Sequence, residues 1–127
     1  MSAPRGTSVE RIPSIDPVDA EARWRTERPT PVLLDVREPN EHAEARAAGA
    51  VLAPLSTLGG RVGDLPRDRP LFVICHSGNR SAMVTAYLRA NGWTDVFNVA
   101  GGMIAWGRAG LAIRRGIPDQ SEYELPG

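Results

Sequence analysis

The stretch from residue 71 to residue 81 reads Leu71-Phe72-Val73-Ile74-Cys75-His76-Ser77-Gly78-Asn79-Arg80-Ser81. Its first part is continuously apolar, which is typical of a strand that is buried on both faces of a sheet. The strand ends at the only cysteine of the chain, a short polar loop follows, and a helix is predicted from Arg80. Ligands of open parallel sheets bind at the carboxyl ends of strands, so this loop is a candidate functional site.

The rest of the chain alternates between predicted strands and predicted helices. Further strands are expected at residues 32–36, 50–53 and 96–99. Helices are expected at residues 17–26, 39–48, 80–91 and 103–109, with a weakly helical stretch at 55–65. This alternation predicts an α/β domain whose central, mostly parallel sheet carries helices on both faces.

Composition narrows the class of protein. The chain has 127 residues, a formal net charge of +0 and one cysteine, and all 15 basic residues are arginine. The absence of lysine excludes Schiff-base chemistry and a phosphate-loop lysine, and a single cysteine excludes an internal disulfide. Balanced charge argues against nucleic acid and membrane surfaces as partners, and no apolar run is long enough to span a bilayer. A free cysteine without an apolar signal segment leads us to expect a cytoplasmic protein.

Cys75 is the candidate nucleophile. Gly78 permits backbone conformations that turn successive N–H groups inward, and such a nest before a helix N-terminus forms an anion site. The same groups are expected to lower the pKa of Cys75 and so favour the reactive thiolate. The alternative is a cysteine that only packs at the end of a buried strand. A packing residue requires no Ser-Gly-Asn-Arg loop, so the loop favours the nucleophile.

Residues 75–81 resemble the active-site loop of rhodanese-like sulfurtransferases, in which Cys-x-Ser-Gly-x-Arg-Ser is common. Two further motifs match that family in the same order. Residues 33–41 (LLDVREPNE) resemble its LLDVREPxE signature, and residues 101–106 (GGMIAW) resemble its GGxxAW box. The resemblance implies a rhodanese-like domain over residues 12–113, between a flexible lead at 1–11 and a surface tail at 114–127.

The sequence departs from the family pattern in two places. Residues 45–50 keep only the final Gly-Ala of the GHIPGA segment that is usual there. His42 stands where Tyr or Phe is common, and His76 stands where Arg is frequent, which leaves one fixed positive charge fewer near the loop. The first departure weakens the expectation for local packing around residues 45–50.

The resemblance implies a double displacement. Cys75 would take a sulfane sulfur from thiosulfate or a persulfide and pass it to cyanide or a thiol. The residues expected to bind the donor and hold the persulfide are His76, Ser77, Gly78, Asn79 and Arg80. Arg80 would either orient an anionic donor or close the loop on backbone carbonyls. With no second cysteine, the acceptor must be an external thiol or protein.

The remaining motif residues are expected to have structural roles. Ser81 is expected to support the loop or the helix start, and Asp35 and Arg37 to form a structural ion pair near the end of the sheet. His42 is expected on the surface of a helix. Neither a cofactor nor a metal site is expected, because two histidines and one cysteine do not make a cluster.

Loop length separates two enzyme classes. Cysteine phosphatases have five residues between Cys and Arg, whereas four stand between Cys75 and Arg80. By resemblance the shorter loop suits a single sulfur atom, and it contains no Asp or Glu to protonate a leaving alkoxide. Phosphatase or arsenate-reductase-like chemistry is therefore the weaker enzyme alternative. A non-catalytic docking or regulatory rhodanese module is the alternative of another class, and the presence of Cys75 argues against it.

Overall fold

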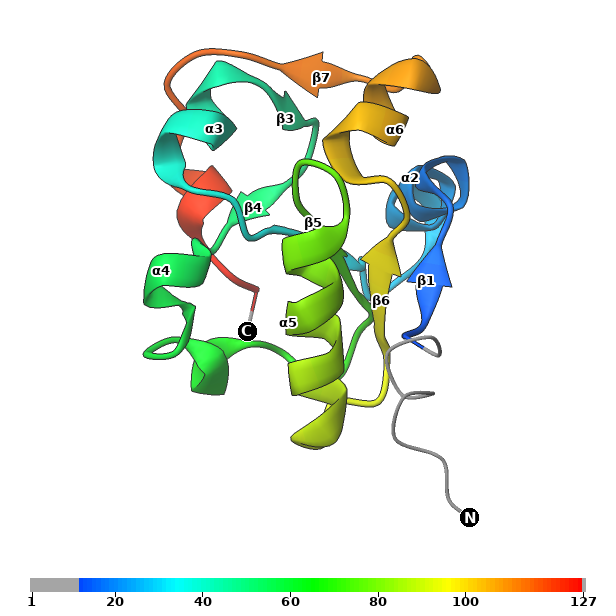
Figure 1. Cartoon of the computed structure of the whole chain (residues 1–127), viewed down its shortest axis with the longest axis vertical. Helices are drawn as coiled ribbons and strands as arrows, with labels where there is room; N and C mark the ends of the chain where they lie inside the picture. Colours follow the sequence, from blue (N-terminus) through cyan, green and yellow to red (C-terminus); the bar gives the residue numbers. More distant parts are fainter. Residues whose placement is uncertain (1–11, 127) are drawn as a thin grey trace.

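A five-stranded sheet forms the centre of the molecule. The computed structural model describes residues 12–126, and the strands of the sheet are β1 (Ser14–Ile15), β2 (Val32–Asp35), β4 (Val51–Leu52), β5 (Leu71–Ile74) and β6 (Val96–Val99). They lie in the order β1-β6-β5-β2-β4, and every neighbouring pair is parallel. The carboxyl ends of the strands therefore meet at one edge of the sheet (Figure 1). The predicted α/β class is confirmed.

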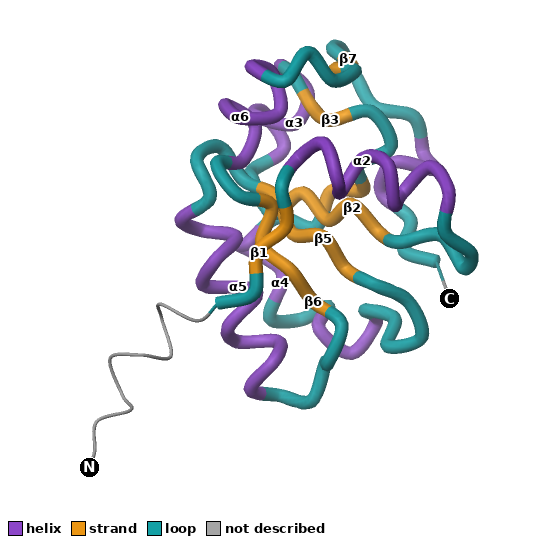
Figure 2. The backbone as a smooth tube through the Cα atoms, turned by 90° about the vertical axis from the view of Figure 1, so that its right-hand side faces the viewer, coloured by secondary structure: helices purple, strands orange, loops and turns teal. Residues whose placement is uncertain are grey.

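Helices cover both faces of this sheet. Because successive side chains of a strand point to opposite faces, Leu71, Val73 and Cys75 pack with α5 (Asn79–Ala90), while Phe72 and Ile74 pack with α2 (Pro17–Thr26) and α6 (Gly102–Arg108). Figure 2 shows α2 and α5 on opposite sides of the strands. The two apolar clusters hold the sheet between them, so the end of β5 is fixed from both sides.

The local signals for helix starts and breaks are present in the structure. Asp16 accepts a hydrogen bond from the N–H of Val18 at 2.9 Å, and Pro17 is the first residue of α2. The weakly helical stretch at 55–65 divides at its glycines into α4 (Leu55–Leu58) and the 3₁₀ turn η1 (Val62–Asp64). Residues 1–11, the predicted lead, lie outside the described residues.

The predicted helix at 39–48 is wrong in its second half. Helix α3 (Pro39–Glu44) ends before Ala45, whose backbone is extended, and the chain continues as β3 (Arg46–Ala47). β3 pairs antiparallel with β7 (Ile113–Arg114), which was not predicted. The guanidinium of Arg46 is fully buried, and it donates hydrogen bonds to Glu122 and to the carbonyl of Gly116. These bonds favour an extended backbone at Arg46 over a continuation of α3.

The C-terminal segment after β7 is mostly exposed, but it is anchored to the rest of the domain at Glu122 and Leu125. Its 3₁₀ turn η2 (Gln120–Tyr123) packs beside β4, and Leu125 lies against the apolar cluster under α5. Glu122 is buried and accepts a hydrogen bond from Arg46 at 2.5 Å. Buried charges are tolerated when they are paired, and this pair ties the segment to β3.

None of the helices within residues 12–126 has the length and apolar character needed to cross a lipid bilayer.

Candidate active site

The loop after β5 lies at the carboxyl edge of the sheet, at the top of α5 in Figure 1, where α3, α6, β3 and β7 also gather. Gly78 has φ +103°, a left-handed conformation that L side chains rarely adopt. This turn allows the chain to reverse within three residues of Cys75 and to enter α5. The prediction that Gly78 shapes the loop agrees with this geometry.

Three hydrogen-bond donors converge on the sulfur of Cys75. The N–H of Gly78 lies 3.1 Å from Sγ, and the N–H and the hydroxyl of Ser81 each lie 3.3 Å from it. The side chain is almost fully buried, with 1% of its surface exposed. Backbone donors were predicted from residues 76–80, and Ser81 adds two that were not. The sulfur therefore occupies a small anion site at the start of α5.

Burial and these donors act in opposite directions on the thiol. Burial raises the pKa of Cys75, whereas hydrogen bonds from the hydroxyl and N–H of Ser81 and from the N–H groups of Gly78 and Ser77 lower it. The hydrogen bonds outweigh burial, so the pKa lies below the ordinary value of a cysteine. The thiolate is the nucleophilic form, so the site favours the reactive state.

Asn98 on β6 is a residue that the sequence analysis missed. Its Oδ1 accepts from the hydroxyl of Ser81 at 2.5 Å, and its Nδ2 donates to the carbonyl of Gly78 at 3.3 Å. One hydroxyl hydrogen serves either Asn98 or the sulfur of Cys75, so Ser81 can turn toward the sulfur when the thiol loses its proton. The available signal was a single amide within the otherwise apolar strand Val96–Val99.

The start of α6 holds the loop from the other side. The N–H of Met103 donates to the carbonyl of Cys75 at 2.8 Å, and that of Ile104 donates to the carbonyl of His76 at 3.1 Å. At Gly102, whose φ is +57°, a Cβ atom would lie 2.3 Å from the carbonyl oxygen of Cys75. The second glycine of the GGMIAW motif is therefore required by the close approach of two backbones.

Among the described residues, Arg80 bonds a carboxylate and not the backbone carbonyls of the loop. Its guanidinium forms a two-point ion pair with Glu41 of α3, with N–O distances of 2.8 and 2.9 Å. The hydrogen bonds from Arg80 lower the pKa of Glu41 to about 2. This pair joins the LLDVREPNE segment to the sulfur loop, and it neutralises the one fixed cation that the loop contains.

Asp35 and Arg37 form the predicted ion pair at the end of β2, at 2.8 Å. Both side chains are buried, and the carboxylate also accepts the backbone N–H of Arg37 at 3.0 Å. His42 is fully buried, not on the surface, because its Nδ1 lies 2.8 Å from Oδ2 of Asp35. Burial raises the pKa of Asp35, but hydrogen bonds from His42 and Arg37 outweigh it and lower the pKa below its usual range.

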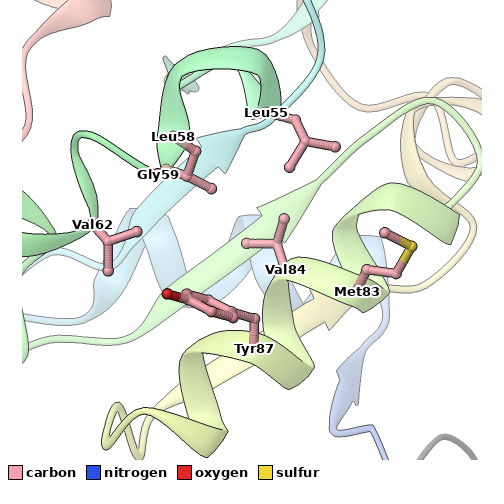
Figure 3. Close-up of a pocket in the computed structure, with 7 residues that line it drawn as sticks. All are labelled: Leu55, Leu58, Gly59, Val62, Met83, Val84 and Tyr87. Atoms are coloured by element: carbon pink, nitrogen blue, oxygen red, sulfur yellow. The ribbon is translucent and has the colours of Figure 1, made fainter.

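Two hollows lie on the surface near the sulfur loop and α5. A pocket of about 230 Å³ opens beside the loop and is lined by Arg37, Glu41, Glu44, Ala45, His76, Met103, Ile104 and Ile113. A groove of about 360 Å³ runs between α4, η1 and α5, and Figure 3 shows its apolar lining: Leu55, Leu58, Gly59, Val62, Met83, Val84 and Tyr87. None of the loop residues 75–81 lines the groove, whereas His76 lines the pocket, so of these two hollows the pocket is the one beside the sulfur loop.

The positions of the other predicted site residues follow from the same loop. His76, Ser77 and Asn79 are exposed at its rim, whereas Gly78 and Ser81 are buried beneath it. Within residues 12–126, no three His, Cys, Asp or Glu side chains are grouped as ligands of a metal ion would be.

Comparison with known proteins decides the family. The model of the rhodanese-like domain family matches residues 18–109. The chain belongs to this family. A sulfurtransferase of Allochromatium vinosum is 39% identical to this rhodanese-like domain over 82 residues, which are 65% of this chain and 77% of that protein. These findings support sulfur transfer as the general class of activity.

Other relatives agree on the fold of the domain. A rhodanese-like domain protein of Staphylococcus aureus is 34% identical, with a TM-score of 0.70 over 81% of this chain and 99% of that one. A putative sulfur carrier protein of Bacillus subtilis is 38% identical over 74 residues, which are 58% of this chain. The match covers only 40% of that protein's length.

Proposed function

We propose that this rhodanese-like domain is a sulfurtransferase of the thiosulfate sulfurtransferase type, which moves a sulfane sulfur from thiosulfate or a persulfide donor to a thiophilic acceptor by way of a Cys75 persulfide. The observation that carries the proposal is the convergence of three donors on the sulfur of the only cysteine. Donors so placed stabilise negative charge on a nucleophilic sulfur, and a packing cysteine has no use for them.

In the first step the Cys75 thiolate attacks the outer sulfur of the donor. A bond forms between Sγ and that sulfur, the S–S bond of the donor breaks, and sulfite or a thiolate leaves with the electron pair. The N–H groups of Gly78 and Ser81 stabilise the attacking anion before the step. The rim residues His76, Ser77 and Asn79 are exposed, so the proposal assigns to them the first contacts with the donor.

In the second step cyanide or a thiol attacks the outer sulfur of the persulfide, and Cys75 leaves as the thiolate. The thiolate is again stabilised by Gly78 and Ser81, so the same donors serve both steps. Since the chain contains no second cysteine, the acceptor is an external small thiol or a protein thiol. A free reactive thiol suits a reducing compartment, so the proposal places the protein in the cytoplasm.

Steady-state turnover tests the proposal. Wild-type protein with thiosulfate and cyanide is expected to form thiocyanate, and Cys75→Ser is expected to form none while keeping the wild-type circular dichroism spectrum. Thr85→Val is a matched control. It removes a buried hydroxyl of α5 that donates to the backbone carbonyl of Ser81 and makes no contact with the sulfur. Absence of thiocyanate with every sulfane donor would reject the proposal, and turnover of an aryl phosphate would favour a phosphatase.

A further inference from the structure

The pocket beside the sulfur loop combines an apolar wall with a charged rim. Met103 and Ile104 of α6 and Ile113 of β7 form the wall, and the exposed side chains of His76 and Glu44 lie at the rim. The backbone of the same α6 residues bonds the carbonyls of Cys75 and His76, so the wall is fixed directly beside the nucleophile's loop. Of the loop residues 75–81, His76 lines the pocket, and it directly follows Cys75 in the chain.

The fixed cations around the pocket are already neutralised. Arg80 is held at two points by Glu41, and Arg37 is held by Asp35 at 2.8 Å and by the carbonyl of Ala45 at 2.7 Å. Within the described residues, Glu44 has no ion-pair partner. A doubly negative inorganic donor therefore finds no unpaired guanidinium at the pocket and one carboxylate that repels it.

The volume of the pocket also exceeds the needs of an inorganic donor. About 230 Å³ is room for several water molecules, each of which takes about 30 Å³ in the liquid. Apolar side chains that line such a space gain free energy when apolar ligand atoms replace the water.

We infer that this pocket binds the apolar substituent R of an organic sulfane donor, R–S–S⁻ or R–SO₂–S⁻, and that the domain uses such donors in preference to inorganic thiosulfate. The inference rests on the proposed function and names the substrate class of the same site. The Cys75 thiolate attacks the outer sulfur, a new S–S bond forms, and the donor's S–S bond breaks. R–S⁻ or the sulfinate R–SO₂⁻ leaves with the electron pair, so no further oxidant or reductant takes part.

The test uses single-turnover sulfur loading of wild-type protein by thiosulfate, methanethiosulfonate and butanethiosulfonate. The two thiosulfonates have the same charge and the same reacting sulfur and differ only in R. Each methylene buried against the wall is worth about fourfold in affinity, so the second-order rate constant is expected to be about tenfold or more higher for the butyl donor than for the methyl donor. Thiosulfate is expected to be the slowest of the three.

Two isoleucine variants locate the effect. Ile104 is 39% exposed, so Ile104→Ser should fold, and it is expected to bring the butyl-to-methyl ratio of rate constants close to one. Ile117, which is 93% exposed and does not line the pocket, supplies the matched control Ile117→Ser, which should keep the wild-type ratio. Equal rates for the two thiosulfonates, or thiosulfate as the fastest donor, would overturn the inference.

Binding to Cys75→Ser separates failure of the pocket from failure of the proposed function. This variant moves no sulfur, yet by calorimetry it is expected to bind butanethiosulfonate about tenfold more tightly than methanethiosulfonate. If Cys75→Ser shows that binding preference but the wild type takes up no sulfur, the proposed function is rejected and the pocket remains an apolar binding site. Sulfur loading of the wild type without that preference would keep the function and reject the pocket.

Discussion

Two buried polar clusters lie at the same edge of the sheet and are built in opposite ways. Around Asp35, the carboxylate accepts hydrogen bonds from Arg37 and His42, and the charges cancel inside the fold. Around Cys75, three donors meet a single sulfur that carries no charge as a thiol. In the first cluster the carboxylate of Asp35 has its partners before any ligand arrives, and within the described residues only the buried Nε2 of His42 has none. The second cluster is best satisfied when the sulfur is an anion. The comparison separates a cluster that stabilises the fold from one that, on the proposed function, prepares a reaction.

The largest expected effect is at the first cluster, on stability. Asp35→Asn leaves the guanidinium of Arg37 buried without its counter-ion, which is expected to lower the free energy of unfolding by about 3–5 kcal/mol. Urea denaturation measures this loss. Asp68→Asn is the control, because it breaks an exposed pair with Arg69 and should change the free energy of unfolding little. Similar losses in both variants would show that the cluster around Asp35 is not structural.

The next effect is at the second cluster, on reactivity. Ser81→Ala removes the hydroxyl that lies 3.3 Å from Sγ, so the pKa of Cys75 is expected to rise. A hydrogen bond to a charged group is worth about 1.5–3 kcal/mol, so the midpoint of the pH profile for alkylation by iodoacetamide is expected to move upward by about one pH unit or more. Alkylation rates measured across pH check the shift. Thr85→Val should leave the rate profile unchanged, and an unchanged profile in Ser81→Ala would contradict this account of the sulfur site.

The smallest effect concerns the ion pair of Glu41 and Arg80, which joins the two regions. Arg80 holds the pKa of Glu41 at about 2, below its ordinary value of 4.5. The pair therefore stabilises the folded state above about pH 4.5, and this contribution is lost as the pH falls toward 2. Both side chains are about one third exposed, at 34% and 30%, so the contribution is at most about 1 kcal/mol.

Glu41→Gln checks this pH dependence. Its stability curve, measured by urea denaturation from pH 5 to pH 2, is expected to fall less steeply than that of the wild type. Glu21→Gln is the control, because the pair of Glu21 with Arg25 lies on the exposed side of α2 and away from the loop. Parallel curves for Glu41→Gln and the wild type would show that the pair does not link folding to protonation.

The features that sequence predicted are those set by short-range pattern. The apolar run 71–74 is a buried strand, Gly78 makes the left-handed turn, and Asp16 caps α2. Each of these depends on neighbouring residues within about one turn of the chain. The loop and its candidate nucleophile could therefore be located before the fold was known.

The features that sequence missed are contacts between distant segments. Glu41 reaches Arg80 across 39 positions, and Arg46 reaches Glu122 across 76. Such pairs form only after the elements pack, and no local pattern identifies the partner of a charged side chain. The burial of His42 has the same origin, because it depends on where β2 places the carboxylate of Asp35.

The central claim is that Cys75 carries one transferable sulfur, and intact-protein mass spectrometry after a single turnover tests it most directly. Wild-type protein treated with a sulfane donor and freed of excess reagent is expected to gain one sulfur atom and to lose it on addition of cyanide. Cys75→Ser is expected to gain none. A wild-type protein that gains no sulfur, or a Cys75→Ser variant that gains one, would contradict the account.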